Sequence, residues 1–176
     1  LDFLLPMFQL KGKTYDLDAS HYMFKPMFRV DHPRRAVWKT ARQVGKTQQL
    51  AASKVLRSIT YAHFNVLLVC PRFEQIKRIS NNYVKPLLQE SPYRDYLIYS
   101  KEKEEQSVLQ RTFGNGSIHY YSFAFLDADR IRSISVSDIA VDETQDMNWD
   151  FIPIIAETMS GSPVFHNQIY LGTPKT

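Results

Sequence analysis

The eight residues that decide the fold read Thr40-Ala41-Arg42-Gln43-Val44-Gly45-Lys46-Thr47. They directly follow the apolar run Ala36-Val37-Trp38 and open a segment with helical periodicity. A Gly-Lys-Thr at a strand-to-helix turn is typical of a phosphate-binding loop, because backbone N–H groups at the helix N-terminus face the anion. Lys46 then neutralises the terminal phosphates, and the Thr47 hydroxyl ligates Mg²⁺. The full pattern has Gly where this chain has Thr40. We predict that all eight residues contact a nucleotide.

An apolar run that ends in two acids forms the second motif. Residues 138–143 read Asp-Ile-Ala-Val-Asp-Glu, which is typical of a buried parallel strand with carboxylates at its carboxyl end. Ligands of open α/β sheets bind at that edge. Asp142 is then placed to hold Mg²⁺, and Glu143 to orient and deprotonate an attacking water. The alternative for adjacent acids after a strand is a helix N-cap. Together the two motifs predict Mg²⁺-dependent ATP hydrolysis.

The composition indicates one core. A chain of 176 residues with 44% hydrophobic content can bury one good core, and a second full domain is not expected. The net charge of +4 permits a polyanionic partner without requiring one. Cys70 is the single cysteine, so no internal disulfide can form. No segment approaches the ~18 apolar residues of a membrane span. We expect a cytosolic protein without a membrane partner and, because the chain does not begin with Met, an incomplete one.

Strands and helices alternate along the sequence. Strands are predicted at residues 36–40, 65–70, 138–143 and 166–172, and helices at 46–61, 73–89 and 149–159. Residues 107–112 and 117–124 flank a Gly-Asn-Gly turn that suits a hairpin. This order favours an α/β fold in which helices sandwich a mostly parallel sheet. Residues 1–35, rich in aromatics, are expected to be an irregular adenine-side or lid segment, beside a P-loop ATPase core of residues 36–176.

Three motifs in order resemble the large terminase subunits of tailed bacteriophages. Residues 40–47 resemble their divergent phosphate loop, and residues 139–143 their acidic strand. Tyr170-Leu171-Gly172-Thr173-Pro174-Lys175 resembles their coupling motif. The resemblance implies a RecA-type sheet with the coupling strand between the other two. It implies an ATPase that drives double-stranded DNA into a procapsid in the host cytoplasm. The implied partners are the portal, the small terminase subunit and further copies in a ring.

The same resemblance assigns roles to single residues. It implies that Arg42 and Thr173 contact the γ-phosphate, and that Arg132 reaches a neighbouring subunit's nucleotide. A surface or DNA-phosphate contact is the alternative for Arg132, and Arg130 could substitute for it. Phe24 is a candidate for stacking on adenine, with core packing as the alternative. Basic residues after the second strand, Arg78 among them, could touch DNA phosphates or form a solvated helix face.

Two other functions remain open from the sequence. Asp142-Glu143-Thr144-Gln145-Asp146 also resembles a motif of some helicases, although a helicase needs a second RecA-type domain. A nucleotide-binding switch without turnover is the other alternative, against which Glu143 argues. No second set of spaced carboxylates follows the coupling motif. We therefore expect an ATPase domain that lacks the C-terminal nuclease domain of full-length family members.

Overall fold

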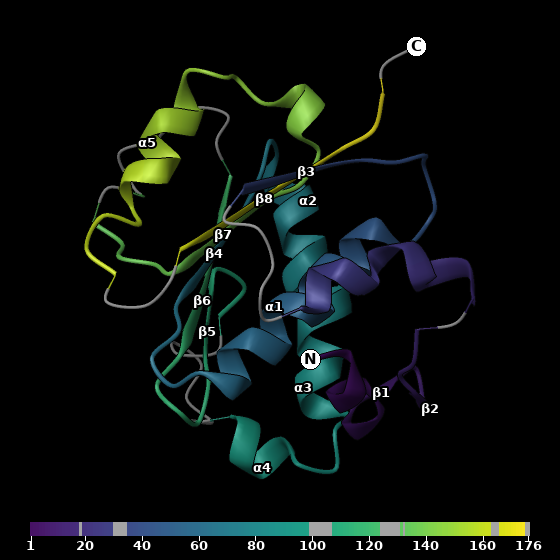
Figure 1. Cartoon of the computed structure of the whole chain (residues 1–176). Coiled ribbons are helices and arrows are strands. Elements are labelled where there is room, and N and C mark those ends of the chain that lie inside the picture. The colour runs from purple at the N-terminus through teal and green to yellow at the C-terminus, as the bar shows by residue number, and fades with distance from the viewer. Residues whose placement is uncertain are drawn as a thin grey trace.

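The computed structural model describes residues 1–17, 19–29, 35–98, 107–123, 131, 133–162 and 166–174. Within them, a six-stranded sheet has the order β3-β8-β7-β4-β6-β5 (Figure 1). β3 to β6 in this order run parallel, and β5 pairs antiparallel with β6. The strands are β3 (Arg35–Lys39), β8 (Asn167–Gly172), β7 (Asp138–Val141), β4 (Val66–Cys70), β6 (Ile118–Phe123) and β5 (Gln110–Thr112).

Helices cover both faces of this sheet (Figure 1). The α-helices are α1 (Lys46–Thr60), α2 (Phe73–Arg78), α3 (Lys85–Gln89), α4 (Arg94–Leu97) and α5 (Phe151–Glu157). A π-helical segment, η3 (Ile79–Val84), joins α2 to α3, so the predicted helix over 73–89 is present but wider in the middle. A 3₁₀ turn, η5 (Thr144–Asp146), follows β7.

The side chains of β4 show how the layers are built. All five of its residues are buried. Leu68 belongs to the core beneath α1, whereas Leu67 and Val69 belong to the core beneath α5. Strands buried on both faces carry continuous apolar runs because every side chain meets a helix layer. This arrangement confirms the predicted three-layer α/β fold, and β8 lies between β3 and β7 as the resemblance implied.

The N-terminal segment is more ordered than expected. It contains the 3₁₀ helices η1 (Asp2–Met7) and η2 (Ala19–Phe28), and a small hairpin of β1 (Gln9–Leu10) and β2 (Lys13–Thr14). Four of its aromatic side chains, Phe8, Tyr15, Phe24 and Phe28, are buried in the core beneath α1, whereas Phe3 and Tyr22 are exposed. The prediction of an irregular segment was wrong, because burial of these rings orders a stretch whose sequence lacks a regular period.

Candidate nucleotide site

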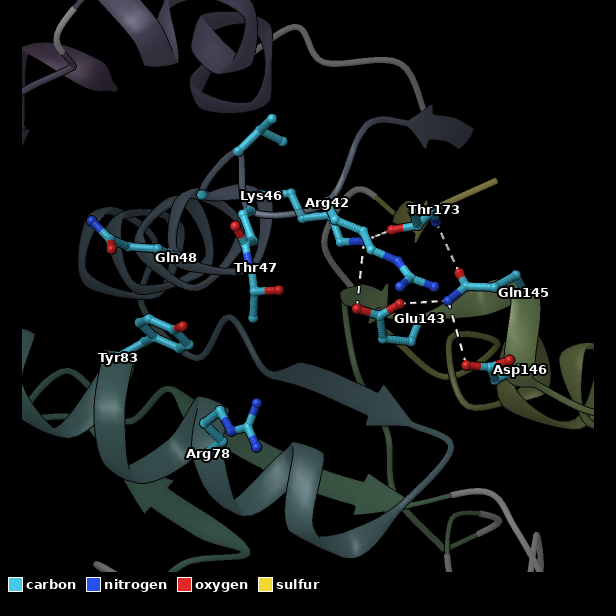
Figure 2. A pocket seen from close by; sticks show the side chains of 13 residues that line it. Arg42, Lys46, Thr47, Gln48, Arg78, Tyr83, Glu143, Gln145, Asp146 and Thr173 are labelled. Atoms are coloured by element: carbon cyan, nitrogen blue, oxygen red, sulfur yellow. Dashed lines mark hydrogen bonds and ion pairs between the residues drawn. The ribbon is translucent and has the colours of Figure 1, made fainter. Parts of the chain in front are cut away.

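Three chain segments meet at the carboxyl ends of adjacent parallel strands. The loop 40–45 leaves β3, the two acids follow β7, and Thr173 follows β8 (Figure 2). The backbone N–H of Thr40 donates to the carbonyl of Gly172 at 3.1 Å, which ties the start of the loop to the end of β8. The register of the sheet therefore brings together side chains that lie up to 133 positions apart in the sequence, from Thr40 to Thr173.

The loop turns into α1 at a position that only glycine fits. Gly45 is the N-cap residue with φ of 77°, in the left-handed region where a Cβ is strained. A Cβ at Gly45 would also lie 2.7 Å from Nε2 of His21. Because no side chain caps the helix there, the first N–H groups of α1 remain available to an anion.

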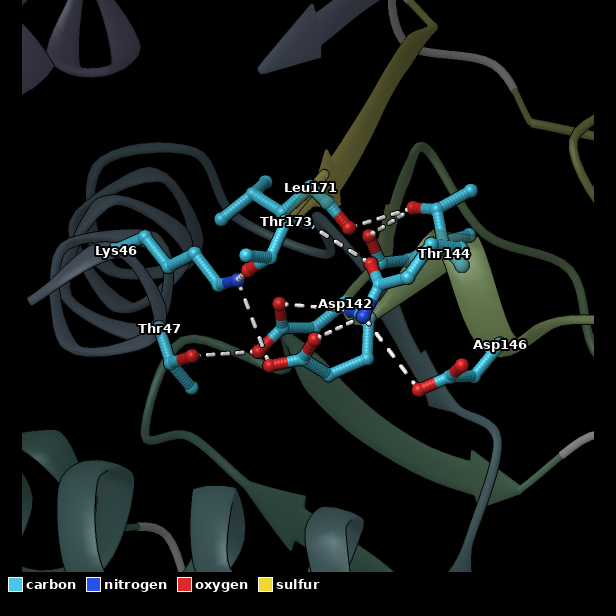
Figure 3. A network of polar contacts seen from close by, with 10 residues as sticks. Lys46, Thr47, Asp142, Thr144, Asp146, Leu171 and Thr173 are labelled. Carbon is cyan, nitrogen blue, oxygen red and sulfur yellow. Dashed lines mark hydrogen bonds and ion pairs between the residues drawn. The ribbon is translucent and has the colours of Figure 1, made fainter. Parts of the chain in front are cut away.

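Lys46 contacts both the segment that follows β7 and the segment that follows β8. Its ammonium donates a hydrogen bond to the hydroxyl of Thr173 (Figure 3) and lies 3.4 Å from Oε1 of Glu143 (Figure 2). Only 9% of the Lys46 side chain is exposed. A cation this buried needs partners, and here they come from both the acidic strand and the coupling strand. Any anion that binds at the loop meets an ammonium already placed at the junction.

The two acids lie in different environments. Asp142 is buried, and its Oδ2 accepts a hydrogen bond from the Thr47 hydroxyl at 2.6 Å. Burial raises the pKa of Asp142, against the lowering effect of that bond. Glu143 is partly exposed and has φ of 54°, a left-handed conformation that costs a non-glycine residue ~1–3 kcal/mol. Such strain clusters at functional sites.

Gln145 is a site residue that sequence reasoning missed. Its Nε2 donates to Oε2 of Glu143 at 2.5 Å, and its Oε1 accepts from the backbone N–H of Thr173 at 3.0 Å (Figure 2). The one sequence signal for it is its place in residues 142–146, whose spacing resembles a helicase motif.

The segments enclose a cavity of about 440 Å³, large enough for a nucleotide's phosphates and ribose. Its far wall is formed by Arg78 and Tyr83, from α2 and η3 (Figure 2). The buried Arg111 of β5 donates to Ser80 Oγ at 3.2 Å and to Asn81 Oδ1 at 3.1 Å, and so braces the π-helical segment. π-Helical turns frequently occur at functional sites. Sequence periodicity predicts a helix here but not which residues face the cavity.

Most predicted site residues line this cavity: Arg42, Gln43, Val44, Gly45, Lys46, Thr47, Glu143 and Thr173. Asp142 reaches it through its bond to Thr47. Thr40 and Ala41 precede the lining residues. Phe24 is fully buried, with its ring centroid 6.0 Å from that of Trp38. A ring with no exposed surface cannot stack on adenine, so the structure corrects that expectation in favour of core packing. Arg130 and Arg132 lie outside the described residues.

Among the described residues, no group of three or more His, Cys, Asp or Glu side chains is arranged to hold a metal ion. None of the helices described is both long and apolar enough to cross a membrane. Cys70 is buried, as expected, and burial raises the pKa of its thiol.

A mostly parallel sheet with a phosphate loop after one strand and acids after another defines a P-loop NTPase fold of the RecA type. The family model of the phage terminase large subunit gpA, ATPase domain, matches residues 22–164, and the chain belongs to this family. None of the curated proteins matches the chain in sequence.

Solved structures show the same fold at low identity. The large terminase of bacteriophage HK97 is 16% identical with a TM-score of 0.75, over 97% of this chain and 36% of its own. The large terminase ATPase domain of Thermus phage P74-26 is 13% identical with a TM-score of 0.69, over 90% and 70%. A large terminase from a thermophilic bacteriophage in complex with ADP is 16% identical with a TM-score of 0.66, over 89% and 38%. This chain therefore spans well under half of the full-length large terminases.

Proposed function

We propose that this chain hydrolyses ATP to drive double-stranded DNA into a viral procapsid. One observation carries the proposal: Lys46, Thr47, Asp142 and Glu143 converge at one rim of the sheet, on a single cavity. A cationic loop and a strand-end carboxylate pair are the groups that triphosphate hydrolysis requires. Family membership supports the packaging role over a helicase.

The reaction follows from the partners of Lys46 and Glu143. A triphosphate on the loop competes with Thr173 and Glu143 for the Lys46 ammonium, because its terminal phosphate carries more negative charge than either. Glu143 then accepts a proton from a water molecule whose oxygen attacks the γ-phosphorus. The bond from that phosphorus to the β,γ-bridging oxygen breaks, which leaves ADP and inorganic phosphate. Arg42, which lines the cavity, adds positive charge beside the phosphates as they separate.

The residues present fit a magnesium ion. The Thr47 hydroxyl and the Asp142 carboxylate are hard oxygen donors 2.6 Å apart. Mg²⁺ is held in such sites by one or two carboxylates, substrate phosphates and waters rather than by an all-protein cage. When bound, the ion neutralises charge on the phosphates. Thr47 and Asp142 are accordingly the groups that we propose to hold it.

The remaining assignments extend this proposal to the assembly. Arg132 is proposed to act on the nucleotide of the next subunit in a homo-oligomeric ring, where an arginine in trans is worth ~10³–10⁵ in rate. The proposed partners are DNA, the portal and the small terminase subunit, met in the host cytoplasm. A ring-dependent arginine predicts slow hydrolysis by the isolated chain, which increases with protein concentration.

The Glu143→Gln substitution tests the hydrolytic role. The variant keeps the size of the side chain and the bond from Gln145, but it lacks the base. We expect ATP affinity within about threefold of wild type and hydrolysis reduced by ~10²–10⁴, the usual contribution of a positioned base. Affinity is measured by calorimetry and turnover by phosphate release. Equal turnover in both proteins would remove Glu143 as the base, whereas ATP binding without turnover in the wild type would favour the nucleotide-binding switch.

A further inference from the structure

The amide of Gln145 touches both the proposed base and the coupling motif. Its Nε2 donates to Glu143 Oε2 at 2.5 Å, and its Oε1 accepts from the Thr173 N–H at 3.0 Å (Figure 2). Lys46 also bonds both Glu143 and Thr173. The four residues therefore form a closed ring of polar contacts: Lys46, Glu143, Gln145 and Thr173.

We propose that Gln145 is a positioning residue that fixes the Glu143 carboxylate and links it to the peptide after β8. This inference rests on the proposed hydrolysis and adds a connection to it. A carboxamide suits the task because one end donates and the other accepts, so a single planar group can hold a carboxylate and a backbone N–H together. Neither a carboxylate nor an apolar side chain can make both bonds at neutral pH.

The surroundings of Gln145 keep the amide in place. The neighbouring Thr144 hydroxyl donates to the carbonyl of Leu171 at 2.6 Å, and this hydrogen bond holds the η5 turn against β8. A Cβ at Gly172 would lie 3.2 Å from Gln145 Oε1, so a larger residue there would crowd the amide. The two segments thus approach each other closely at the residue before Thr173.

The ring predicts how a change at the phosphate reaches the coupling strand. When a phosphate binds the Lys46 ammonium, Lys46 loses its contacts with Glu143 and Thr173. Gln145 then remains as the connection between those two residues. A displacement of the Glu143 carboxylate is then carried by one rigid amide to the Thr173 peptide. Loss of the amide should impair catalysis more than nucleotide binding, because Gln145 bonds the base and not the P-loop backbone.

Two substitutions in the 176-residue chain separate the two bonds. Gln145→Glu keeps an acceptor for Thr173 but places a carboxylate against Glu143, whereas Gln145→Leu removes both bonds. Gln89→Leu makes the same chemical change at an exposed helix end and serves as the control. The measurements are steady-state ATP hydrolysis, thermal melting to confirm folding, and NMR exchange of the Thr173 amide proton.

We expect both Gln145 variants to lose about 10-fold or more in kcat with KM within about threefold, since a base contributes fully only when positioned. Exchange of the Thr173 amide should quicken in Gln145→Leu and stay slow in Gln145→Glu. Wild-type kcat in both variants, or a rise in KM alone, would overturn the role of Gln145 and leave the proposed function standing. Failure of the wild-type chain to hydrolyse ATP at any concentration would overturn the proposed function and this inference with it.

Discussion

Helix α1 is joined to β7 by charged and polar side chains at both ends of the strand, and the two junctions differ in burial. At the carboxyl end of β7, Thr47 bonds Asp142 at 2.6 Å beside an open cavity. At the other end, Lys54 Nζ lies 2.5 Å from Asp138 Oδ1, and both side chains are fully buried. One junction can exchange its partners for a ligand, whereas the other is sealed.

The sealed junction is unusual in its charge. Arg57 is also fully buried, with Nε 3.9 Å from Asp138 Oδ2, so two cations share one carboxylate. Burial lowers the pKa of Lys54 to about 8, with Asp138 opposing the shift. Burying charges is costly, and their pairing offsets the cost only in part. We infer that this end fixes α1 against the sheet while the cavity end does the chemistry. The following substitutions test that division.

The largest effect, a loss in the free energy of unfolding, is expected from Asp138→Asn. This substitution leaves two buried cations without a counter-charge. Removing one partner of a buried ion pair costs about 3–5 kcal/mol, and urea unfolding measures the loss. Lys54→Met should cost less, because Arg57 still faces Asp138. If Asp138→Asn were as stable as wild type, the sealed junction would have no structural role.

Lys46→Met should act in the opposite way, on function rather than on stability. Loss of the ammonium removes a preorganised charge at the phosphates, and such groups are worth about 10²–10³ in rate. We expect hydrolysis to fall by that factor while the unfolding free energy changes by less than about 1 kcal/mol. Lys39→Met, an exposed lysine at the end of β3, is the matched control and should retain wild-type turnover.

An intermediate effect is expected from Gly45→Ala, which perturbs the loop itself. The left-handed backbone costs alanine ~1–2 kcal/mol, and its Cβ would lie 2.7 Å from His21 Nε2. Gly12→Ala has the same backbone strain, with φ of 72° and no atom within 4 Å of the added Cβ. ATP affinity should fall about 10-fold in Gly45→Ala and not in Gly12→Ala. Equal affinities would show that the crowding at His21 does not matter.

The smallest effect concerns the far wall of the cavity. Arg78→Ala removes an exposed cation that lines it, so we expect KM for ATP to rise by about two- to fivefold, in line with the ~1 kcal/mol of a solvated ion pair. Lys77→Ala, the adjacent exposed residue on α2 that does not line the cavity, should leave KM unchanged. An equal rise in KM for ATP in both variants would indicate a general effect of positive surface charge.

The sequence predicted most of the residues that line the near side of the cavity, but not those of its far side. The residues of the loop and of the acidic strand act through local geometry, a strand end followed by a turn, and local patterns report such geometry. On the far side, Tyr83 belongs to a π-helical segment that Arg111 of another strand braces, and Arg78 is the residue of α2 directly before that segment. Phe24 is buried because Trp38 packs beside it. Contacts between distant segments leave no periodic signal in the chain.

The sealed junction was likewise hidden in the sequence. Lys54 lies among the polar positions of a predicted amphipathic helix, where a solvated lysine is the usual outcome. Asp138 begins an apolar run and by itself indicates only the start of a strand. The two pair because β7 lies beneath α1 in the assembled sheet.

The most direct test of the central claim is a structure of the chain with Mg²⁺ and a slowly hydrolysed ATP analogue. We predict the terminal phosphate at the Lys46 ammonium, the ion beside Thr47 and Asp142, and the Glu143 carboxylate facing the γ-phosphorus through a water molecule. A nucleotide bound away from this rim, or phosphates beyond contact of Lys46, would contradict the proposal.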